Sequence, residues 1–516
     1  MLALATSVLS TPALAQAPEP RAVRRLTLDE ALDLAVGTSE QVAIARAGAE
    51  LARAGEQRAR SEFLPQVNGS ASYDRTLASE FEGLFGGTDS GTSCQPLLVN
   101  PGASLAERVA ELERAYDCPP ADGFFDGGDS DLPFGQANTW RFNLQVSQAL
   151  FAGGRITAQK QQAIAQRESA DLGVTAAQAR AMLDVAQAFL DAALSDRLLA
   201  IAQLSFDQAD RAYRQTRAQR EAGRQSEFDL LSAQVERDTL QPEVVARQAA
   251  RRLAYLRLKQ LLEIPLDTEL LADVEVVDDN LVPPARLAAA IADAETGNVP
   301  AVSAALDQVR NEVRVREADV TIARSQRLPS IFLQSSYGLV NYSGVPAFDE
   351  YRDNWTVGAT LAIPIFTGGR TRADERIARA GVEQARQQLR LANEVASLDR
   401  ESAREQLLSA RAAWDATAGT VRQAERAYEI AELRYREGLS TQLELSDARL
   451  LLEQAQLNRA SAGRALQLAR IRAALLPDLP LGTASSAQAA SAGAGQTSQT
   501  RTTSSAGGAT SAGVPQ

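Results

Sequence analysis

Apolar and polar residues alternate along two segments of the chain. In 140–147 and in 355–363 every second residue is apolar, starting at Trp140 and at Trp355. A period of two predicts strands, and about ten residues with this pattern are typical of the lipid-facing strands of a membrane barrel. Trp140 and Trp355 would then lie at the membrane interface. Strands of a soluble sandwich remain the alternative. Including the weaker segments before them, we expect strands at about 66–74, 138–151, 331–340 and 354–366.

Two proline-free stretches predict helices instead. Residues 156–222 and 371–437 each comprise 67 residues rich in Ala, Gln, Arg, Glu and Leu, which favour helices. At 1.5 Å per residue, each helix would be roughly 100 Å long. A compact domain cannot bury such a helix along its length.

A glycine and a shorter helical stretch follow each long helix. These return helices are expected at 226–262 and 441–476, and Leu443, Leu450 and Leu457 keep a heptad spacing in the second. The pattern predicts antiparallel neighbours packed as in coiled coils. Pro242 should kink or break the first return helix.

The chain contains an internal duplication. Leu-Phe-Ala-Gly-Gly-Arg at 150–155 and Ile-Phe-Thr-Gly-Gly-Arg at 365–370 are 215 residues apart, and Trp140 and Trp355 share this offset. Segments around two Leu-Pro pairs lie 264 residues apart, so the first copy carries an insertion of 49 residues. One duplication predicts two copies of one structural unit. The predicted organisation is a signal peptide at 1–15, a linker at 16–25, a first repeat at 26–264 with an inserted external loop at 75–137, a second repeat at 265–480 and a disordered Ser/Thr/Ala/Gly-rich tail at 481–516.

The N-terminus and the composition indicate an exported protein without common catalytic chemistry. Ala13-Leu14-Ala15 ends an apolar run like a signal-peptidase site. Export favours a disulfide between Cys94 and Cys118.

The chain of 516 residues has a net charge of −12 and no histidine. An acidic chain is a poor nucleic-acid partner, and the lack of histidine removes His-based triads and metal sites. We expect no enzymatic activity, no cofactor and no metal site.

Four strands cannot close a membrane barrel, and an open edge is not viable in lipid, so several copies must pool their strands. A β-β-long-helix unit that occurs twice, with Phe-x-Gly-Gly-Arg at each strand-to-helix junction, resembles the outer membrane efflux protein family, whose type member is TolC. The resemblance runs from about Leu26 to Pro477. It implies a mainly α protein with a transmembrane β part. Three copies would form one 12-stranded outer-membrane β-barrel, continued by a periplasmic α-helical barrel.

The same resemblance implies a function and partners. The homotrimer would be a passive duct in outer-membrane lipid, working in a tripartite efflux or type I secretion system. Its partners would be a periplasmic adaptor protein and an inner-membrane pump. The cargo stays open between small molecules and polypeptides.

The resemblance also assigns roles to individual residues. The strand-to-helix junctions are Gly153, Gly154, Arg155, Gly368, Gly369 and Arg370. The periplasmic tip turns and adaptor contacts are Gly223, Gly438 and Leu439. The pore constriction is Asp229, Glu444, Asp447 and Tyr435. From the residues alone, the better explanation of the three carboxylates is that they are first-turn residues favoured by the helix dipole; the resemblance makes the constriction role an equal alternative for Glu444 and Asp447. Ser440 departs from the type member, which has an arginine there.

Two other functions stay open. A periplasmic adaptor also has long helical hairpins, although usually one hairpin and no paired alternating strands. An exported enzyme using carboxylates for acid–base chemistry is the third possibility, but no nucleophile motif supports it.

Overall fold

The computed structural model describes residues 24–78, 97–98, 100–117, 138–266, 270–272, 284–297, 303–342 and 351–482. The predicted signal peptide, both cysteines and residues 483–516 of the predicted tail lie outside these ranges. The chain divides into two compact units. A helical unit draws on 1–59, 157–323 and 370–516, and a sheet unit draws on 60–156 and 324–369.

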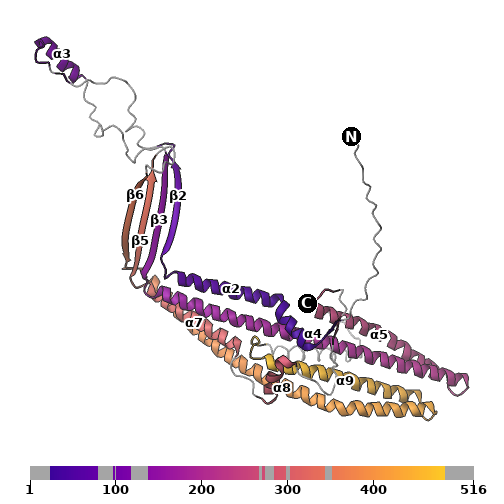
Figure 1. The fold of residues 1–516 in the computed structure, drawn as a ribbon. Coiled ribbons are helices and arrows are strands. Elements are labelled where there is room, and N and C mark those ends of the chain that lie inside the picture. The colour runs from indigo at the N-terminus through magenta and orange to yellow at the C-terminus, as the bar shows by residue number, and fades with distance from the viewer. Residues whose placement is uncertain are drawn as a thin grey trace, which may run out of the picture. The chain divides into compact units, whose positions relative to one another are not determined.

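The elements follow one another in the order that Figure 1 labels. They are β1 (Arg24–Leu26), α1 (Leu28–Thr38), α2 (Glu40–Ser61), β2 (Gln66–Arg75), α3 (Leu105–Tyr116), β3 (Asn138–Phe151), α4 (Arg155–Glu221), α5 (Glu227–Leu261), β4 (Leu270–Ala272), the 3-10 turn η1 (Ala285–Leu287), α6 (Ala288–Glu295), α7 (Ala304–Ser325), β5 (Ser330–Asn341), β6 (Arg352–Ala362), α8 (Arg370–Arg436) and α9 (Gln442–Leu475).

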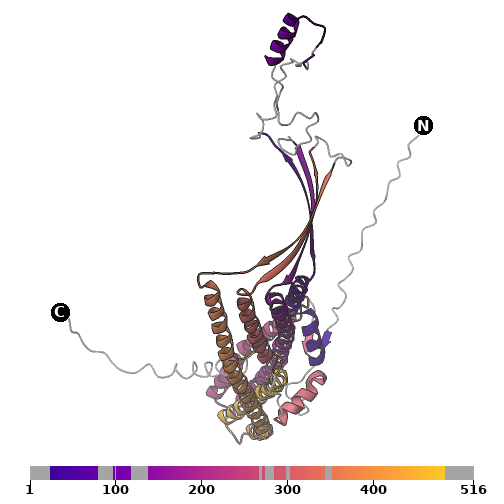
Figure 2. The same cartoon turned by 90° about the vertical axis from the view of Figure 1, so that its left-hand side faces the viewer.

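The sheet unit is built on four antiparallel strands in the order β2-β3-β5-β6. Each copy of the duplication supplies two adjacent strands, and the copies meet where β3 pairs with β5. The strands twist strongly along their length (Figure 2), and a bulge between Ala149 and Phe151 interrupts one register. Among the described strands, β2 and β6 each pair on one side only. The sheet is therefore open at both edges.

The last strand is shorter than the alternation suggests. We expected it to reach residue 366, but β6 ends at Ala362. Pro364 has no backbone N–H for a strand neighbour, so the apolar pattern continues for a few residues beyond the hydrogen bonding. The inserted segment also contains a helix, α3, that the sequence analysis did not anticipate.

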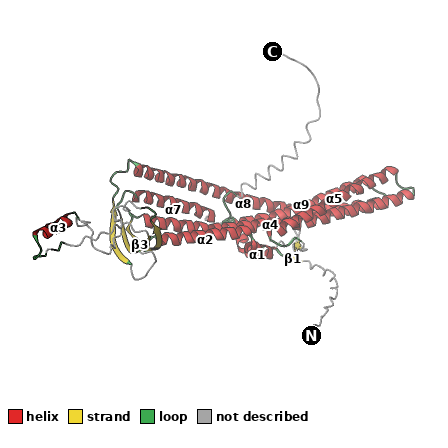
Figure 3. Ribbon diagram, turned by 90° about the horizontal axis from the view of Figure 1, so that it is seen from above, coloured by secondary structure: helices red, strands yellow, loops and turns green. Residues whose placement is uncertain are grey.

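The helical unit contains two long antiparallel helical hairpins. Helices α4 and α8 are 67 residues each, and Figures 1 and 3 show α4 beside α5 and α8 beside α9. The predicted break at Pro242 is wrong, because α5 continues through it. A proline removes one backbone hydrogen bond, and the turns on either side keep theirs. No helix in the described ranges has an apolar run long enough to cross a bilayer.

The main core of this unit lies at mid-length of α4. Leu32 of α1, Phe189 of α4, Leu258 of α5 and Ile471 of α9 are essentially inaccessible to water there. Helix α1 begins with a capping box between Thr27 and Glu30. The short parallel pair β1–β4 brings the segment before this helix beside the segment that follows α5. These short elements add side chains around the middle of the long helices.

Candidate functional site: the sheet faces and the helical tips

The two faces of the sheet differ in chemistry. Directly opposed residues of antiparallel strands share a face, so the register sorts side chains into rows. Rows of the first face are Val67–Val146–Ser335–Val357, Gly69–Leu144–Tyr337–Trp355 and Ala71–Phe142–Leu339–Asp353. Rows of the second face are Asn68–Gln145–Ser336–Thr356 and Ser70–Asn143–Gly338–Asn354. One face is mainly apolar and the other is polar, yet large apolar side chains such as Val357 and Leu361 are exposed. Such a sheet suits a boundary between an apolar medium and water.

Trp140 and Trp355, which we predicted to lie at the membrane interface, are both on the apolar face but at different places in the register. Trp140 is opposite Asn341, and Trp355 is opposite Tyr337, four residues away on β5. That separation is about 13 Å along the strand. The two rings would share one membrane depth only if the strands are tilted, as barrel strands are. Trp140 packs against Tyr73 with ring centroids 4.4 Å apart and the ring planes tilted by 34°, and the Trp355 Nε1–H donates to Ser335 Oγ at 3.0 Å.

The strand-to-helix junctions need their glycines. Gly153 and Gly154 have φ of 59° and 85°, and Gly368 and Gly369 have φ of 59° and 89°. These left-handed angles are accessible to glycine without steric cost. At Gly153 a β-carbon would also lie 2.9 Å from Leu328 Cβ. At this turn the backbone therefore passes close to the segment that leads into β5. Arg155, the first residue of α4, lies 3.9 Å from Glu62.

The two helical tips turn in the same way. Gly223 and Gly438 both have φ of 73°. The N–H of the residue after each glycine donates to the carbonyl five positions back, at 2.8 Å, from Arg224 to Gln219 and from Leu439 to Arg434. This is the Schellman ending of a helix. Leu439 is 70% exposed, so the second tip presents an apolar side chain.

The three predicted constriction carboxylates lie in different surroundings. Asp229 closes a capping box at the start of α5: its Oδ2 accepts from Ser226 Oγ at 2.6 Å, and its own N–H donates to Ser226 Oγ. Glu444 and Asp447 on α9 are exposed. The Glu444 carboxylate lies 3.9 Å from Arg434. The structure thus places Asp229 in a local helix cap and leaves the other two carboxylates at the surface.

Tyr435 is a buried residue of the second tip. It is 1% exposed and packs with Tyr428, Leu445 and Leu452. Thr216 Oγ1 of α4 donates to the Ala212 carbonyl at 2.8 Å, so the Tyr435 hydroxyl donates to Thr216 Oγ1 at 2.5 Å. Burial raises the pKa of Tyr435 above its usual value. This hydrogen bond connects the two hairpins.

Sequence reasoning missed a second connection between the hairpins. Arg449 of α9, with 6% of its side chain exposed, donates to Glu236 of α5 at 2.9 Å and to Glu453 at 3.0 Å. Ser446 and Gln442 also donate to Glu236, and Ser205 of α4 donates to Glu453 at 2.8 Å. The Arg449–Glu453 spacing of four is visible in the sequence, but the partner on α5 is not. We call Glu236, Arg449 and Glu453 the hairpin clamp.

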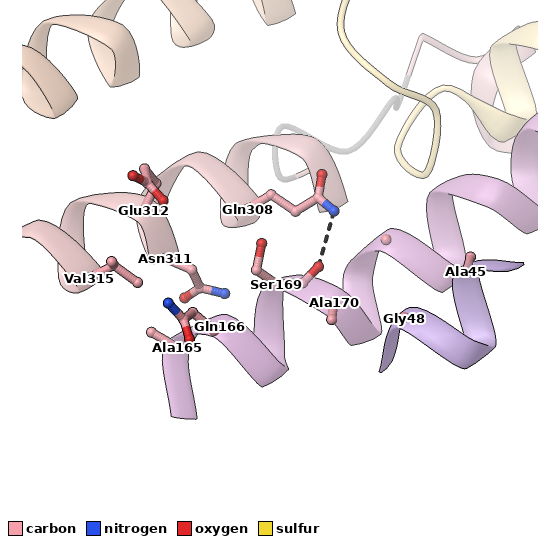
Figure 4. A pocket seen from close by; sticks show the side chains of 11 residues that line it. Ala45, Gly48, Ala165, Gln166, Ser169, Ala170, Gln308, Asn311, Glu312 and Val315 are labelled. Carbon is pink, nitrogen blue, oxygen red and sulfur yellow. Dashed lines mark hydrogen bonds between the residues drawn. The ribbon is translucent and has the colours of Figure 1, made fainter. Parts of the chain in front are cut away.

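An open groove of about 410 Å³ lies between α2, α4 and α7 (Figure 4). Small side chains such as Ala45, Gly48 and Ala170 line it, and Gln308 Nε2 donates across it to the Ser169 carbonyl at 3.1 Å. Glu312 is the one ionisable residue of its lining. The groove therefore offers no acid–base pair. In the described part of the chain, no three acidic or cysteine side chains cluster closely enough to hold a metal ion.

Known proteins resemble this chain over much of its length. It matches the outer membrane efflux protein profile over residues 103–263 and 299–472. Among curated proteins it is 26% identical over 300 residues to the pyoverdine export outer membrane protein OpmQ of Pseudomonas putida, across 56% of this chain and 59% of OpmQ. The match thus spans less than two thirds of that relative.

Solved structures share the fold. The outer membrane protein VceC of Vibrio cholerae superposes with a TM-score of 0.64 at 18% identity, over 87% of this chain and 96% of VceC. The Campylobacter jejuni CmeC outer membrane channel gives 0.65 at 15% identity, over 90% of this chain and 88% of CmeC. Because the profile covers more than half of the chain, in both copies of the duplication, the chain belongs to the outer membrane efflux protein family.

Proposed function

We propose that this chain is the outer-membrane channel of a tripartite efflux or type I secretion system. Three copies form a passive duct, and an inner-membrane pump, reached through a periplasmic adaptor, supplies the energy. The chain itself carries out no chemistry on the cargo. The observation that carries the proposal is the sheet, which has one apolar face, one polar face and two open edges.

The open edges support a homotrimer. Unpaired backbone groups at a strand edge are costly in lipid, and β2 and β6 must find partners in other copies. Three copies supply twelve strands, within the range of membrane barrels. The apolar face would then contact lipid, and the polar face would line the lumen. Family membership favours this arrangement over the adaptor alternative.

The hairpins supply the periplasmic part of the duct. Their tips, at Gly223 and at Gly438 with Leu439, are the surfaces that we assign to the adaptor. Exposed Leu439 would give this contact apolar area. The Cys94–Cys118 disulfide remains a prediction for the inserted segment.

We assign the constriction to Glu444 and Asp447. Both side chains are exposed near the start of α9. In a trimer they would form two adjacent acidic rings, which attract cations as acidic rings do in other pores. Tyr435 supports this region because its hydrogen bond to Thr216 connects the two hairpins. Asp229 supports it because it belongs to the capping box that begins α5.

Single-channel recording in a planar bilayer tests the proposal, with the native mass of the detergent-purified protein measured in parallel. We expect a trimer and discrete, cation-selective conductance steps. A protein that stays soluble and monomeric without detergent, and never inserts, would overturn the duct and favour the adaptor alternative.

A further inference from the structure

Helix α3 of the inserted segment carries an apolar stripe that nothing in the described part of the chain covers. Leu105, Val109, Leu112 and Tyr116 recur at spacings of four, three and four, and they are 80%, 47%, 58% and 87% exposed. This is the a/d spacing of a coiled coil. The neighbouring segment contacts another flank, where the Leu98 N–H donates to Glu111 at 3.4 Å. The stripe itself stays open.

A helix of this length gains little stability alone. Isolated helices below about 12–15 residues are marginal in water, and α3 has 12 residues. Its start is well formed, because Ser104 and Glu107 form a capping box. An amphipathic helix is normally stabilised by packing of its apolar face, so the stripe requires a partner.

The charges beside the stripe identify that partner as another copy of the helix. With Leu105 and Leu112 at d positions, Arg108 occupies a g position and Glu113 the e position five residues later. These are the positions that pair between neighbouring parallel helices in a coiled coil. Neither side chain forms an ion pair within the described ranges. By contrast, Glu111 pairs with Arg114 inside the same helix.

We propose that the α3 helices of the three copies pack in parallel about the symmetry axis, with the stripe as core and Arg108–Glu113 pairs between neighbours. This inference rests on the proposed trimer, in which rotation about one axis makes equivalent helices parallel. The cluster would stand at the external opening of the duct and narrow it.

The connecting chain is long enough for this association. Twenty-nine residues separate β2 from α3, and 21 separate α3 from β3. A chain of that shorter length spans up to roughly 70 Å when extended. Attachment to one trimer also makes the association intramolecular, which raises the effective concentration of the helices for one another. A short helix can therefore associate here although it would not in dilute solution.

Site-directed cross-linking in the full-length chain tests the proposal. Leu112→Cys lies in the stripe, and Ala110→Cys, on the other side of the helix, is the matched control. Both are placed in a Cys94→Ser/Cys118→Ser background and treated with a short bismaleimide. We expect roughly tenfold more linked dimer from Leu112→Cys than from Ala110→Cys, because position 112 lies in the core of the cluster and position 110 lies on its outer side.

The charge pair gives an independent readout. Arg108→Glu should lower the yield of the Leu112→Cys link, and Arg108→Glu/Glu113→Arg should restore it. If the cysteine-free background does not fold, a photo-cross-linking residue at 112 or 110 in the otherwise native chain replaces the cysteines.

The outcomes separate the two proposals. A trimer by native mass that gives no link at position 112, or equal links at 112 and 110, overturns the α3 cluster and leaves the duct intact. A chain that is not trimeric overturns the proposed function itself.

Discussion

At the tip between α4 and α5, Asp229 lies six residues after Gly223, and at the tip between α8 and α9, Glu444 lies six residues after Gly438. The two glycines share a φ of 73°. Asp229 folds back onto Ser226 and completes a capping box. The equivalent Thr441 accepts a hydrogen bond from the Glu444 N–H, while the Glu444 carboxylate lies 3.9 Å from Arg434.

The comparison shows that duplication preserves the turn but not the role of the side chains after it. The short aspartate closes the local cap, and the longer glutamate remains exposed. A second pair of equivalent positions differs in the same way. Arg220 is half-buried and pairs with Glu227 of α5, whereas Tyr435 is buried against α4. The second tip therefore supplies both the exposed acidic groups and the buried contact between hairpins.

The largest effect should come from breaking the hairpin clamp. Arg449→Ala removes the buried cation from the carboxylates of Glu236 and Glu453, which are 17% and 14% exposed. Breaking a fully buried ion pair costs about 3–5 kcal/mol, and these partly buried carboxylates keep other donors, so we expect a cost at or below the lower end, about 3 kcal/mol. Arg426→Ala is the matched control, since Arg426 pairs with Glu429 on the exposed surface of α8; its effect should be within about 0.5 kcal/mol. Thermal unfolding of the detergent-solubilised protein by circular dichroism measures both. Equal losses would show that the clamp contributes no more than a surface pair.

Next in size are the turn glycines, where the two tips should behave alike. Gly223→Ala and Gly438→Ala each force a β-carbon into left-handed backbone, at a cost of about 1–2 kcal/mol. Gly419→Ala inside α8 is the control, because it has ordinary helical backbone and free space around it; it should be neutral or stabilising by up to about 1 kcal/mol. The same unfolding experiment compares them. Tips that differ strongly would contradict the shared geometry.

Features that depend on neighbouring residues, or that occur twice in the chain, could be predicted from the sequence. The long helices follow from composition and lack of proline, and their equal offset follows from the duplication. The junction and tip glycines stand out because they occur twice. Helix α3 occurs in one copy only, so no such comparison supports it.

Contacts between distant parts of the chain were harder to predict. Arg449 and Glu236 are 213 residues apart, and their pairing depends on how two hairpins align. The burial of Tyr435 depends on the same alignment, which no local pattern encodes.

A smaller difference in stability should separate the tip carboxylates. Asp229→Ala removes one side of the capping box and should cost about 0.5–1 kcal/mol, without changing conductance. Glu444→Ala/Asp447→Ala should leave stability within about 0.5 kcal/mol. It should raise single-channel conductance and lower cation selectivity, because two charged side chains per copy leave the proposed constriction. A double variant with unchanged conductance and selectivity would remove Glu444 and Asp447 from the constriction and keep the duct.

The smallest expected effect is a pH dependence of stability that arises at Tyr435. Only the second tip should show it, because the equivalent residue of the first tip is Arg220. Burial raises the pKa of Tyr435 above its ordinary value, whereas an unfolded tyrosine ionises at about pH 10. Tyr435 therefore contributes stability that is complete below pH 10 and is lost as the pH rises from there through the pKa of the folded state.

Tyr435→Phe should lose up to about 1 kcal/mol of stability at neutral pH, because the hydrogen bond to Thr216 is removed. It should also show a shallower loss of stability at alkaline pH than the wild type. Thr216→Val removes the same hydrogen bond but keeps the buried phenol, so its alkaline loss should persist. Melting temperatures measured between neutral pH and pH 11 distinguish the two variants, and identical alkaline profiles would place the titrating group elsewhere.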